Sequence, residues 1–376
     1  MSPTARYKPW WMPTAIVVLL LLSMTLLTVL IMQRGGGKIA EQSKHSNHEV
    51  IQWDMVTSWP KNFPGLGTGP ENFAKMVKDM SDGRLIITVH GANSIVPALG
   101  VFDAVSSGSV EMGHSAAYYW KGKMPAAPFF TSVPFGMNVI EYNGWLRYGG
   151  GLKLWRDLYK PYHVIPFAGG NTGVQMGGWF NREINSIKDI QGLKMRIPGL
   201  GGEVFTRAGG TAVNIPASEL YNALQTGVID ATEWVGPYND LAIGFHQIAK
   251  YYYYPGWHEP GPALEFIVNE DAYNSLPPDL QAIIEAATRA VNEDMLDEYE
   301  ARSLAALDEL KNHYKVDIRP FPPDVLAEFR RQAMAIYRET EKSDPTFARI
   351  AHSYFDYMEQ AKGYADITEK AYYELR

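Results

Sequence analysis

The chain has 376 residues, of which 46% are hydrophobic and 20% are charged, and this composition excludes a disordered protein. The whole chain carries −7 and residues 1–48 carry +4, so the rest carries −11, and an acidic body without a basic run excludes nucleic-acid binding. Cysteine is absent, which excludes disulfides, thiolate metal sites and a lipid-modified cysteine.

An apolar segment stands near the N-terminus. Residues 15–32 contain no charge and follow a basic stretch at 1–14; as a helix they would measure about 27 Å, close to a bilayer core. The sequence that follows, IMQR (31–34), is a poor cleavage site, which favours a retained transmembrane anchor over a cleaved signal segment without excluding the latter. Polar residues 33–48 are typical of a flexible tether. We therefore expect 1–14 in the cytoplasm and a periplasmic (extracytoplasmic) body tethered to the inner membrane.

The body alternates short apolar runs with stretches of helical spacing. We expect strands at 50–56, 85–89, 110–114, 164–167, 175–180 and 193–197, and helices at 71–80, 101–107, 143–158, 202–208, 218–226 and 240–249. Such alternation is typical of α/β proteins whose sheets are covered on both faces. The four tyrosines at 251–254 favour strand packing over a carbohydrate platform.

A long helical stretch closes the chain. Residues 280–310 keep an apolar stripe and would form a helix of roughly 46 Å, longer than one compact domain needs. It therefore spans two domains or packs on a partner, and a second helical block at 323–341 follows. We expect domain I to comprise 49–165 plus 230–255 and domain II to comprise 166–229 plus 256–278. We expect the region 279–376 to serve as hinge or dimer surface.

Several enzyme signatures are missing from the sequence. The nine histidines never fall at the HxxxH or HExxH spacing of zinc proteases. The sequence contains neither a GxSxG elbow nor a Walker loop, and its glycine-rich pieces lack the full GxGxxG order.

Four polar residues stand where the local pattern predicts burial or a pocket wall. Arg196 ends an apolar strand and can fork onto a carboxylate; Glu233 and Glu259 each lie beside a tryptophan and can ligate Na⁺ or Ca²⁺ or act as an acid–base pair. Gln175 is flanked by glycines that let the backbone approach a ligand. The pattern alone leaves open the ordinary alternatives, which are a structural ion pair, solvated loop acids and a loop amide.

Together these segments carry a family resemblance. INSIKDIQGLKMRIPGLGGEVFTRAGGTAVNIPASELYNALQTGVIDATEW (184–234) resembles the core of the DctP-type substrate-binding subunits of TRAP (tripartite ATP-independent periplasmic) transporters. NEDAYNSLPPDLQAIIEAA (269–287) resembles the next segment of that family, and the likeness covers roughly residues 49–330. The resemblance implies a periplasmic-binding-protein type II-like α/β fold, with two α/β domains around a central cleft, joined by crossing strands and a long C-terminal helix.

The resemblance also implies roles for individual residues. The set is similar to the subgroup that binds 2-oxo or 2-hydroxy monocarboxylates through a cation, in which the residue at Arg196 pairs with the ligand carboxylate. The Na⁺ or Ca²⁺ ion would then be held by the side chains of Glu233, Glu259 and Gln175 and by the carbonyl of Trp234. The loop at 113–120 resembles the first-domain wall of the cleft. This adds three substrate-binding candidates: Ser115, Ala116 and Tyr118.

The implied function is transport rather than catalysis. The chain would capture a small organic anion, such as a 2-oxo acid or lactate, and deliver it to the membrane permease subunits of a TRAP transporter. The aromatic C-terminal stretch at 353–375 would suit a homodimer. Two alternatives stay open, an extracytoplasmic enzyme with Glu233 and Glu259 as acid and base, and a sugar-acid binder on the same fold. The sequence does not decide the ligand or choose between Na⁺ and Ca²⁺.

Overall fold

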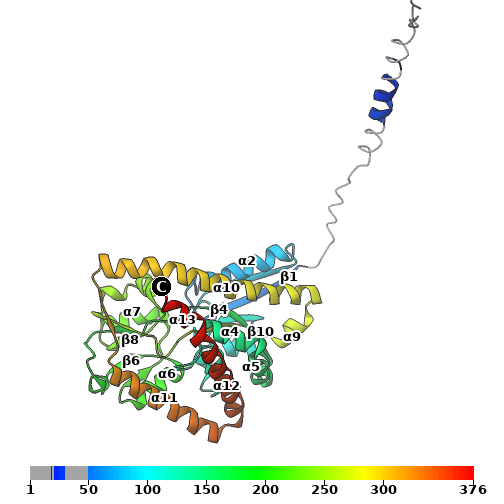
Figure 1. Cartoon of the computed structure of the whole chain (residues 1–376). Helices are drawn as coiled ribbons and strands as arrows, with labels where there is room; N and C mark the ends of the chain where they lie inside the picture. Colours follow the sequence, from blue (N-terminus) through cyan, green and yellow to red (C-terminus); the bar gives the residue numbers. More distant parts are fainter. Residues whose placement is uncertain (1–17, 19–20, 30–49) are drawn as a thin grey trace, which may run out of the picture. The chain divides into compact units, whose positions relative to one another are not determined.

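A computed structural model of the chain describes residues 18, 21–29 and 50–376, and Val50–Arg376 forms one compact unit (Figure 1). The predictions for 1–14 and 33–48 lie outside the described residues. The apolar segment 15–32 is described only at 18 and 21–29, where it is helical. No helix in the described part of the chain is long and apolar enough to cross a membrane.

The first sheet has five strands in the order β2-β1-β3-β10-β4. β1 pairs in parallel with β2 and β3, whereas β10 runs antiparallel to both β3 and β4. All seven residues of β10 are buried, so this strand is covered on both faces rather than on alternate positions. The strands are β1 (Ile51–Thr57), β2 (Leu85–His90), β3 (Met112–Ser115), β4 (Val164–Asn171) and β10 (Ala263–Asn269).

The second sheet has six short strands in the order β11-β9-β5-β8-β6-β7. β6 is parallel to β7 and β8, and β9 is parallel to β11; β5 runs antiparallel to β8 and β9. The tyrosine run forms β9, as predicted, and Tyr252 stacks on Trp179 with ring centroids 4.1 Å apart. The strands are β5 (Gly178–Phe180), β6 (Lys194–Arg196), β7 (Thr211–Val213), β8 (Ala231–Thr232), β9 (Tyr251–Tyr254) and β11 (Asp317–Pro320).

Residues 230–255 and 256–278 pair in the opposite sheets from those that the predicted domain division assigns to them. β8 and β9 come from 230–255, which was assigned to domain I, yet they pair in the second sheet. β10 comes from 256–278, which was assigned to domain II, yet it pairs in the first. The seven-residue strand β10 is buried throughout and pairs with both β3 and β4. The shorter strands β8 and β9 pair with β5, which is also short. The domain boundaries themselves stay a prediction.

Helices connect and cover the strands. Those of the first part of the unit are α2 (Thr68–Met80), α3 (Val101–Ser106), α4 (Val139–Tyr148) and α5 (Gly151–Tyr159), with short turns η1 (Ala117–Trp120), η2 (Ala127–Phe130) and η3 (Lys160–Tyr162). The others before the long helix are η4 (Ile187–Ile190), α6 (Gly199–Arg207), α7 (Ala217–Gln225), α8 (Pro237–Ile243), η5 (Phe245–Gln247) and α9 (Glu270–Ser275). The predicted single helix at 143–158 is wrong, because it breaks into α4 and α5 at Gly150, whose φ of 91° no helix accommodates.

The predicted long helix is confirmed as α10 (Pro278–Asp308), which continues into η6 (Glu309–His313). Its buried stripe includes Leu280, Ile284, Val291 and Tyr299, at the spacing of one helix face. α10 packs against β4 and α2 beside the first sheet and against α8 beside the second, and Figure 1 shows it running past both. It therefore links the two halves of the unit.

The C-terminal helices fold back onto the body. They are α11 (Pro323–Ser343), α12 (Pro345–Ile367) and α13 (Glu369–Tyr373), and α11 confirms the predicted second helical block. α11 packs on α6, and α12 packs on α4 and α5. The hydroxyl of the buried Tyr354 accepts a hydrogen bond of 2.7 Å from the Met137 N–H. The start of α12 thus belongs to the core, while Tyr372 and Tyr373 of α13 are exposed.

A buried carboxyl lies between these layers, on β10. Glu265 accepts hydrogen bonds from Trp120 Nε1 at 2.5 Å and from the Tyr159 hydroxyl at 2.8 Å. Burial raises the pKa of Glu265 to about 7, although both hydrogen bonds act in the opposite direction. The folded chain therefore holds a proton here that the unfolded chain releases at lower pH.

This pKa predicts how stability depends on pH. Since the folded pKa of about 7 exceeds the unfolded value, the stabilising contribution is complete below the unfolded pKa and is lost as pH rises through 7. Between the two pKa values the loss is about 1.4 kcal/mol per pH unit. Urea unfolding at pH 5 and pH 8 should show a smaller difference for Glu265→Gln than for the wild type. An equal pH dependence in both chains would contradict the assignment.

Candidate functional site

A buried ion pair forms where two neighbouring parallel strands end. β6 and β8 pair with Arg196 opposite Thr232, and the Glu233 N–H donates to the Arg196 carbonyl at 3.2 Å. The side chains of Arg196 and Glu233 are both 1% exposed, and Arg196 Nη1 donates to Glu233 Oε1. A buried charge needs such a partner, because leaving one member alone costs about 3–5 kcal/mol. The strand register therefore places the two charges together.

The remaining contacts of Arg196 fix the guanidinium plane. Nε donates to the Ile215 carbonyl at 3.2 Å, and Nη2 donates to the Tyr119 hydroxyl at 3.3 Å. The guanidinium carbon lies 5.1 Å from the centre of the Trp234 ring, within cation–π range. Arg196 is thus held from several sides.

Two loops join the ion pair. The Gln175 N–H donates to the Glu259 carbonyl at 3.2 Å, and the Gly256 N–H donates to the Gln175 carbonyl at 2.9 Å. A Cβ at Gly256 would collide with that carbonyl, so this close approach requires glycine. The Met176 N–H donates to the Val235 carbonyl at 3.1 Å. Backbone bonds therefore hold the loops of Gln175, Glu233 and Glu259 together.

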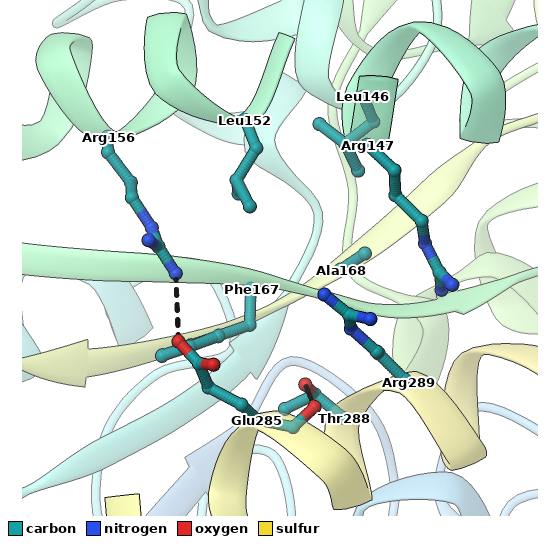
Figure 2. Close-up of a pocket in the computed structure, with 9 residues that line it drawn as sticks. All are labelled: Leu146, Arg147, Leu152, Arg156, Phe167, Ala168, Glu285, Thr288 and Arg289. Atoms are coloured by element: carbon teal, nitrogen blue, oxygen red, sulfur yellow. Dashed lines mark hydrogen bonds and ion pairs between the residues drawn. The ribbon is translucent and has the colours of Figure 1, made fainter. Parts of the chain in front are cut away.

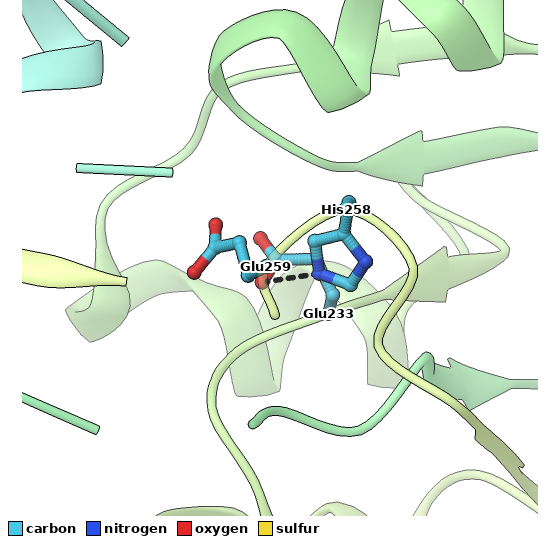
Figure 3. Close-up of side chains that lie close together, drawn as sticks. All are labelled: Glu233, His258 and Glu259. Carbon is cyan, nitrogen blue, oxygen red and sulfur yellow. Dashed lines mark ion pairs between the residues drawn. The ribbon is translucent and has the colours of Figure 1, made fainter. Parts of the chain in front are cut away.

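Three ionisable side chains gather at the end of these loops. Oxygen or nitrogen atoms of Glu233, His258 and Glu259 lie within 4.8 Å of one another (Figure 3). His258 Nε2 lies 3.4 Å from Glu233 Oε2, without a hydrogen bond. All three residues are at most 4% exposed.

Burial governs the ionisation of this cluster. It raises the pKa of Glu259 well above its ordinary value; the Glu233 carboxylate adds to the rise and Arg196 opposes it. Burial also raises the pKa of Tyr118, with a further contribution from Glu259. For Arg196 burial alone would lower the pKa, but the Glu233 carboxylate raises it above its ordinary value. One positive charge thus faces two carboxyl groups.

The donor set fits a hard cation. Among the described residues, Gln175 Oε1, Glu233 Oε2 and Glu259 Oε2 are buried and accept no hydrogen bond. Buried oxygens normally have a partner, and carboxylate and amide oxygens are the ligands that Na⁺ or Ca²⁺ takes. The same ion would offset the excess negative charge.

A small cleft adjoins these oxygens. Its free space is about 10 Å³, on the scale of a single water molecule. The wall combines apolar side chains with the polar groups above and comprises Trp59, Leu66, Tyr118, Thr172, Gln175, Trp234, Val235, Glu259, Pro262 and Leu264. The chemistry of this lining suits a ligand with both an apolar and a charged part, but the free space would have to widen to admit one.

The predicted residues fall into two groups. The structure brings Arg196, Glu233, Glu259 and Gln175 together with the Trp234 ring, and Tyr118 lines the cleft. Ser115 and Ala116 of the loop at 113–120 do not line the cleft, although Ala116 belongs to the same apolar cluster as Trp59 and Trp234 of its wall, and their roles stay predictions. The hydroxyl of Ser115 is hydrogen-bonded to that of Ser58 at 2.7 Å, and Ala116 is buried in an apolar cluster.

Sequence reasoning missed three residues of the site. His258 precedes Glu259 directly, and Tyr119 follows Tyr118, so both stood beside residues that were selected. Trp59 lies in a turn-rich stretch with no strand or helix pattern, and the sequence offered no signal for it. It reaches the cleft because its indole N–H donates to His114 Nδ1 at 2.8 Å.

The chain is similar to known solute-binding proteins over most of its length. The model of the family described as bacterial extracellular solute-binding protein, family 7, matches residues 55–344. A monocarboxylate 2-oxoacid-binding periplasmic protein from Nostoc sp. is 42% identical over 322 residues, which is 86% of this chain and 88% of that protein.

Solved structures show the same likeness. A TRAP periplasmic solute-binding protein from Pseudoalteromonas atlantica, with bound sodium and pyruvate, is 47% identical with a TM-score of 0.85; the match covers 87% of this chain and 99% of that one. Another from Colwellia psychrerythraea, with bound calcium and pyruvate, is also 47% identical with a TM-score of 0.85, over 87% of this chain and all of that one (100%).

The unpaired oxygens predict a stabilising response to a cation alone. In a chain freed of Na⁺ and Ca²⁺, adding either ion at about 100 times its dissociation constant should stabilise the fold by about 2.7 kcal/mol, because the ion binds only the folded state. Thermal melting measures the shift. Glu259→Gln should abolish it, whereas Glu359→Gln, at an exposed position, should not.

A second readout separates this role from a structural one. In the ion-free chain Glu259→Gln should not lower the melting temperature, because it removes a carboxyl group whose pKa burial raises. An ion-induced shift that survives Glu259→Gln would exclude Glu259 as a ligand.

Proposed function

The chain belongs to the bacterial extracellular solute-binding proteins of family 7, and on that premise we propose that it captures a small 2-oxo monocarboxylate together with a cation for a TRAP transporter. The observation that carries the proposal is the set of three buried oxygens that accept no hydrogen bond, beside the Arg196–Glu233 ion pair. Relatives with about half of their residues identical hold pyruvate with sodium or calcium. A sugar acid is the alternative ligand on the same fold.

Arg196 and its neighbours would divide the recognition of the ligand. Glu233, Glu259 and Gln175 would hold the cation, with the Trp234 carbonyl as a further ligand; bound there, the cation supplies positive charge and coordination sites for ligand oxygens. Arg196 would orient the carboxylate through its guanidinium fork, and Tyr119 holds that fork from the other side. Substrate and cation would bind cooperatively, because each completes the partners of the other.

The apolar wall would set the size of the substrate. Leu66 and Leu264 are 2% and 3% exposed and face the cleft with Trp59. Elements on both sheets contribute to this wall, which supports our proposal that two lobes close on the ligand. Closure would exclude water and strengthen each polar contact.

The family indicates the cellular location of the chain. Its members are extracytoplasmic binding proteins that work with membrane permease subunits. We propose that residues 15–32 stay in the inner membrane as a tether, which would raise the effective concentration of the binder near its permease. The homodimer expected from the aromatic C-terminus also stays a prediction.

Catalysis is the alternative class of function. The raised pKa of Glu259 and the ion pair of Glu233 would suit a general acid beside an ionised carboxylate. We infer binding instead, because the family binds solutes and the same two carboxyl groups face an unpaired amide oxygen, as a cation site requires.

Titration of the full chain with pyruvate tests the proposal. Calorimetry should detect binding only when Na⁺ or Ca²⁺ is present, and pyruvate should be recovered unchanged. Gln175→Leu should weaken the cation-dependent binding about tenfold or more by removing one oxygen ligand, and Arg196→Lys should do the same by removing the fork. Gln247→Leu, at an exposed glutamine, is the matched control.

Three results would contradict parts of this proposal. Pyruvate binding of equal affinity with and without cation would refute the bridging ion. Binding of a six-carbon sugar acid but not of pyruvate would favour the alternative ligand. Conversion of pyruvate by the wild type, lost in Glu259→Gln, would favour the enzyme.

The apolar wall generates a separate prediction about selectivity. Leu66→Ala should raise the affinity for 2-oxobutyrate relative to pyruvate by about tenfold, because a hydrophobic pocket discriminates one methylene by that order. Leu276→Ala is the control, since Leu276 is equally buried but lies outside the cleft wall. An unchanged affinity ratio in Leu66→Ala would show that Leu66 does not limit the ligand.

A further inference from the structure

A second pocket lies away from the cleft, where α4, α5 and α10 meet over β4. It encloses about 180 Å³ and shares no residue with the wall of the cleft. Its lining comprises Leu146, Arg147, Leu152, Arg156, Phe167, Ala168, Glu285, Thr288 and Arg289. Figure 2 shows Arg147 reaching in from α4 and Arg289 from α10, on opposite sides of β4 in that view.

Three arginines face this pocket and only one carboxylate offsets them. Arg156 Nη2 lies 3.5 Å from Glu285 Oε1, and its guanidinium carbon lies 5.4 Å from the centre of the Phe167 ring. Its Nε is buried and donates no hydrogen bond within the described residues. Arg156 and Glu285 thus form an ion pair, and no carboxylate of the pocket neutralises the other two arginines.

These two arginines are Arg147 and Arg289. Within residues 50–376 no hydrogen bond or ion pair is recorded for either guanidinium, and both side chains are exposed. The guanidinium fork matches the oxygens of a carboxylate or phosphate, so two such forks lining one pocket offer donors that an oxyanion would accept from.

Apart from Thr288, the rest of the lining is apolar. Leu146, Leu152, Phe167 and Ala168 form it, and Phe167 already carries the Arg156 guanidinium against its ring. A bare inorganic anion would use the arginines but leave Leu152 and Ala168, which are partly exposed, in contact with water. An organic anion would use both, because its apolar part would bury them.

We propose that this pocket binds a small amphiphilic anion, with its carboxylate or phosphate between Arg147 and Arg289 and its apolar part against Leu152 and Ala168. The site is a second one on the chain, independent of the cation-dependent cleft. It stands within a body of net charge −11, so the attraction for anions is local to the pocket.

Calorimetric titration of the full chain in EDTA tests the site with four probes. Phenyl phosphate and benzoate carry the two oxyanions on one aromatic ring, benzyl alcohol is the neutral analogue, and inorganic phosphate is the anion without an apolar part. At least one aromatic anion should bind, with benzyl alcohol and inorganic phosphate binding at least about tenfold more weakly. The stronger of phenyl phosphate and benzoate identifies the oxyanion.

Variants locate the binding. Arg147→Gln and Arg289→Gln should each weaken the aromatic anion about tenfold, and either single variant suffices if the double one fails to fold. Arg338→Gln removes an equal charge at an exposed position elsewhere and should leave the affinity unchanged, as should Arg196→Lys in the cleft. The proposal is overturned if no probe binds saturably up to about 10 mM, or if Arg338→Gln weakens binding as much as the pocket variants do.

Discussion

The ion pair between Arg196 and Glu233 is the constraint on which the site depends. Both side chains are withdrawn from water, and each would be costly alone. The parallel register of β6 and β8 brings them together, and the Glu233 N–H bond to the Arg196 carbonyl fixes their backbones. The guanidinium then has Trp234 against its face and Tyr119 at its edge. Removal of either Arg196 or Glu233 would leave the other charge buried without a counterion.

The pair satisfies Arg196 but not the acids around it. Glu233 uses one oxygen for the arginine and keeps the other unbonded, while Glu259 and Gln175 each present a further unbonded oxygen. These three oxygens come from loops that backbone hydrogen bonds already hold together. The protein therefore holds three buried hydrogen-bond acceptors close together, and no hydrogen bond of the described fold uses them. A site for a positively charged ligand explains that arrangement better than structural need does.

Sequence patterns predicted the long helix α10, the α/β class and the four polar residues of the cluster. They did so because apolar spacing and a family signature are local properties of the chain. The strand order depends on contacts between distant segments: β10 pairs with β3, which lies about 150 residues earlier. Only the length of the buried run in β10 indicates a central position in a sheet. His258 and Trp59 escaped for a similar reason. Their neighbours in space belong to distant segments, and no spacing in the sequence announces them.

The two arginine-lined sites differ in how the charge is used. In the cleft the carboxylate of Glu233, directly after the adjacent strand β8, neutralises Arg196, so under our proposal binding of an organic anion would depend on additional positive charge near Glu259. In the pocket beneath α4 and α10 the only carboxylate serves Arg156, and Arg147 and Arg289 keep their full charge. Ionic strength should therefore act differently on the two sites. Screening reaches the exposed arginines directly, whereas the buried pair is shielded from it.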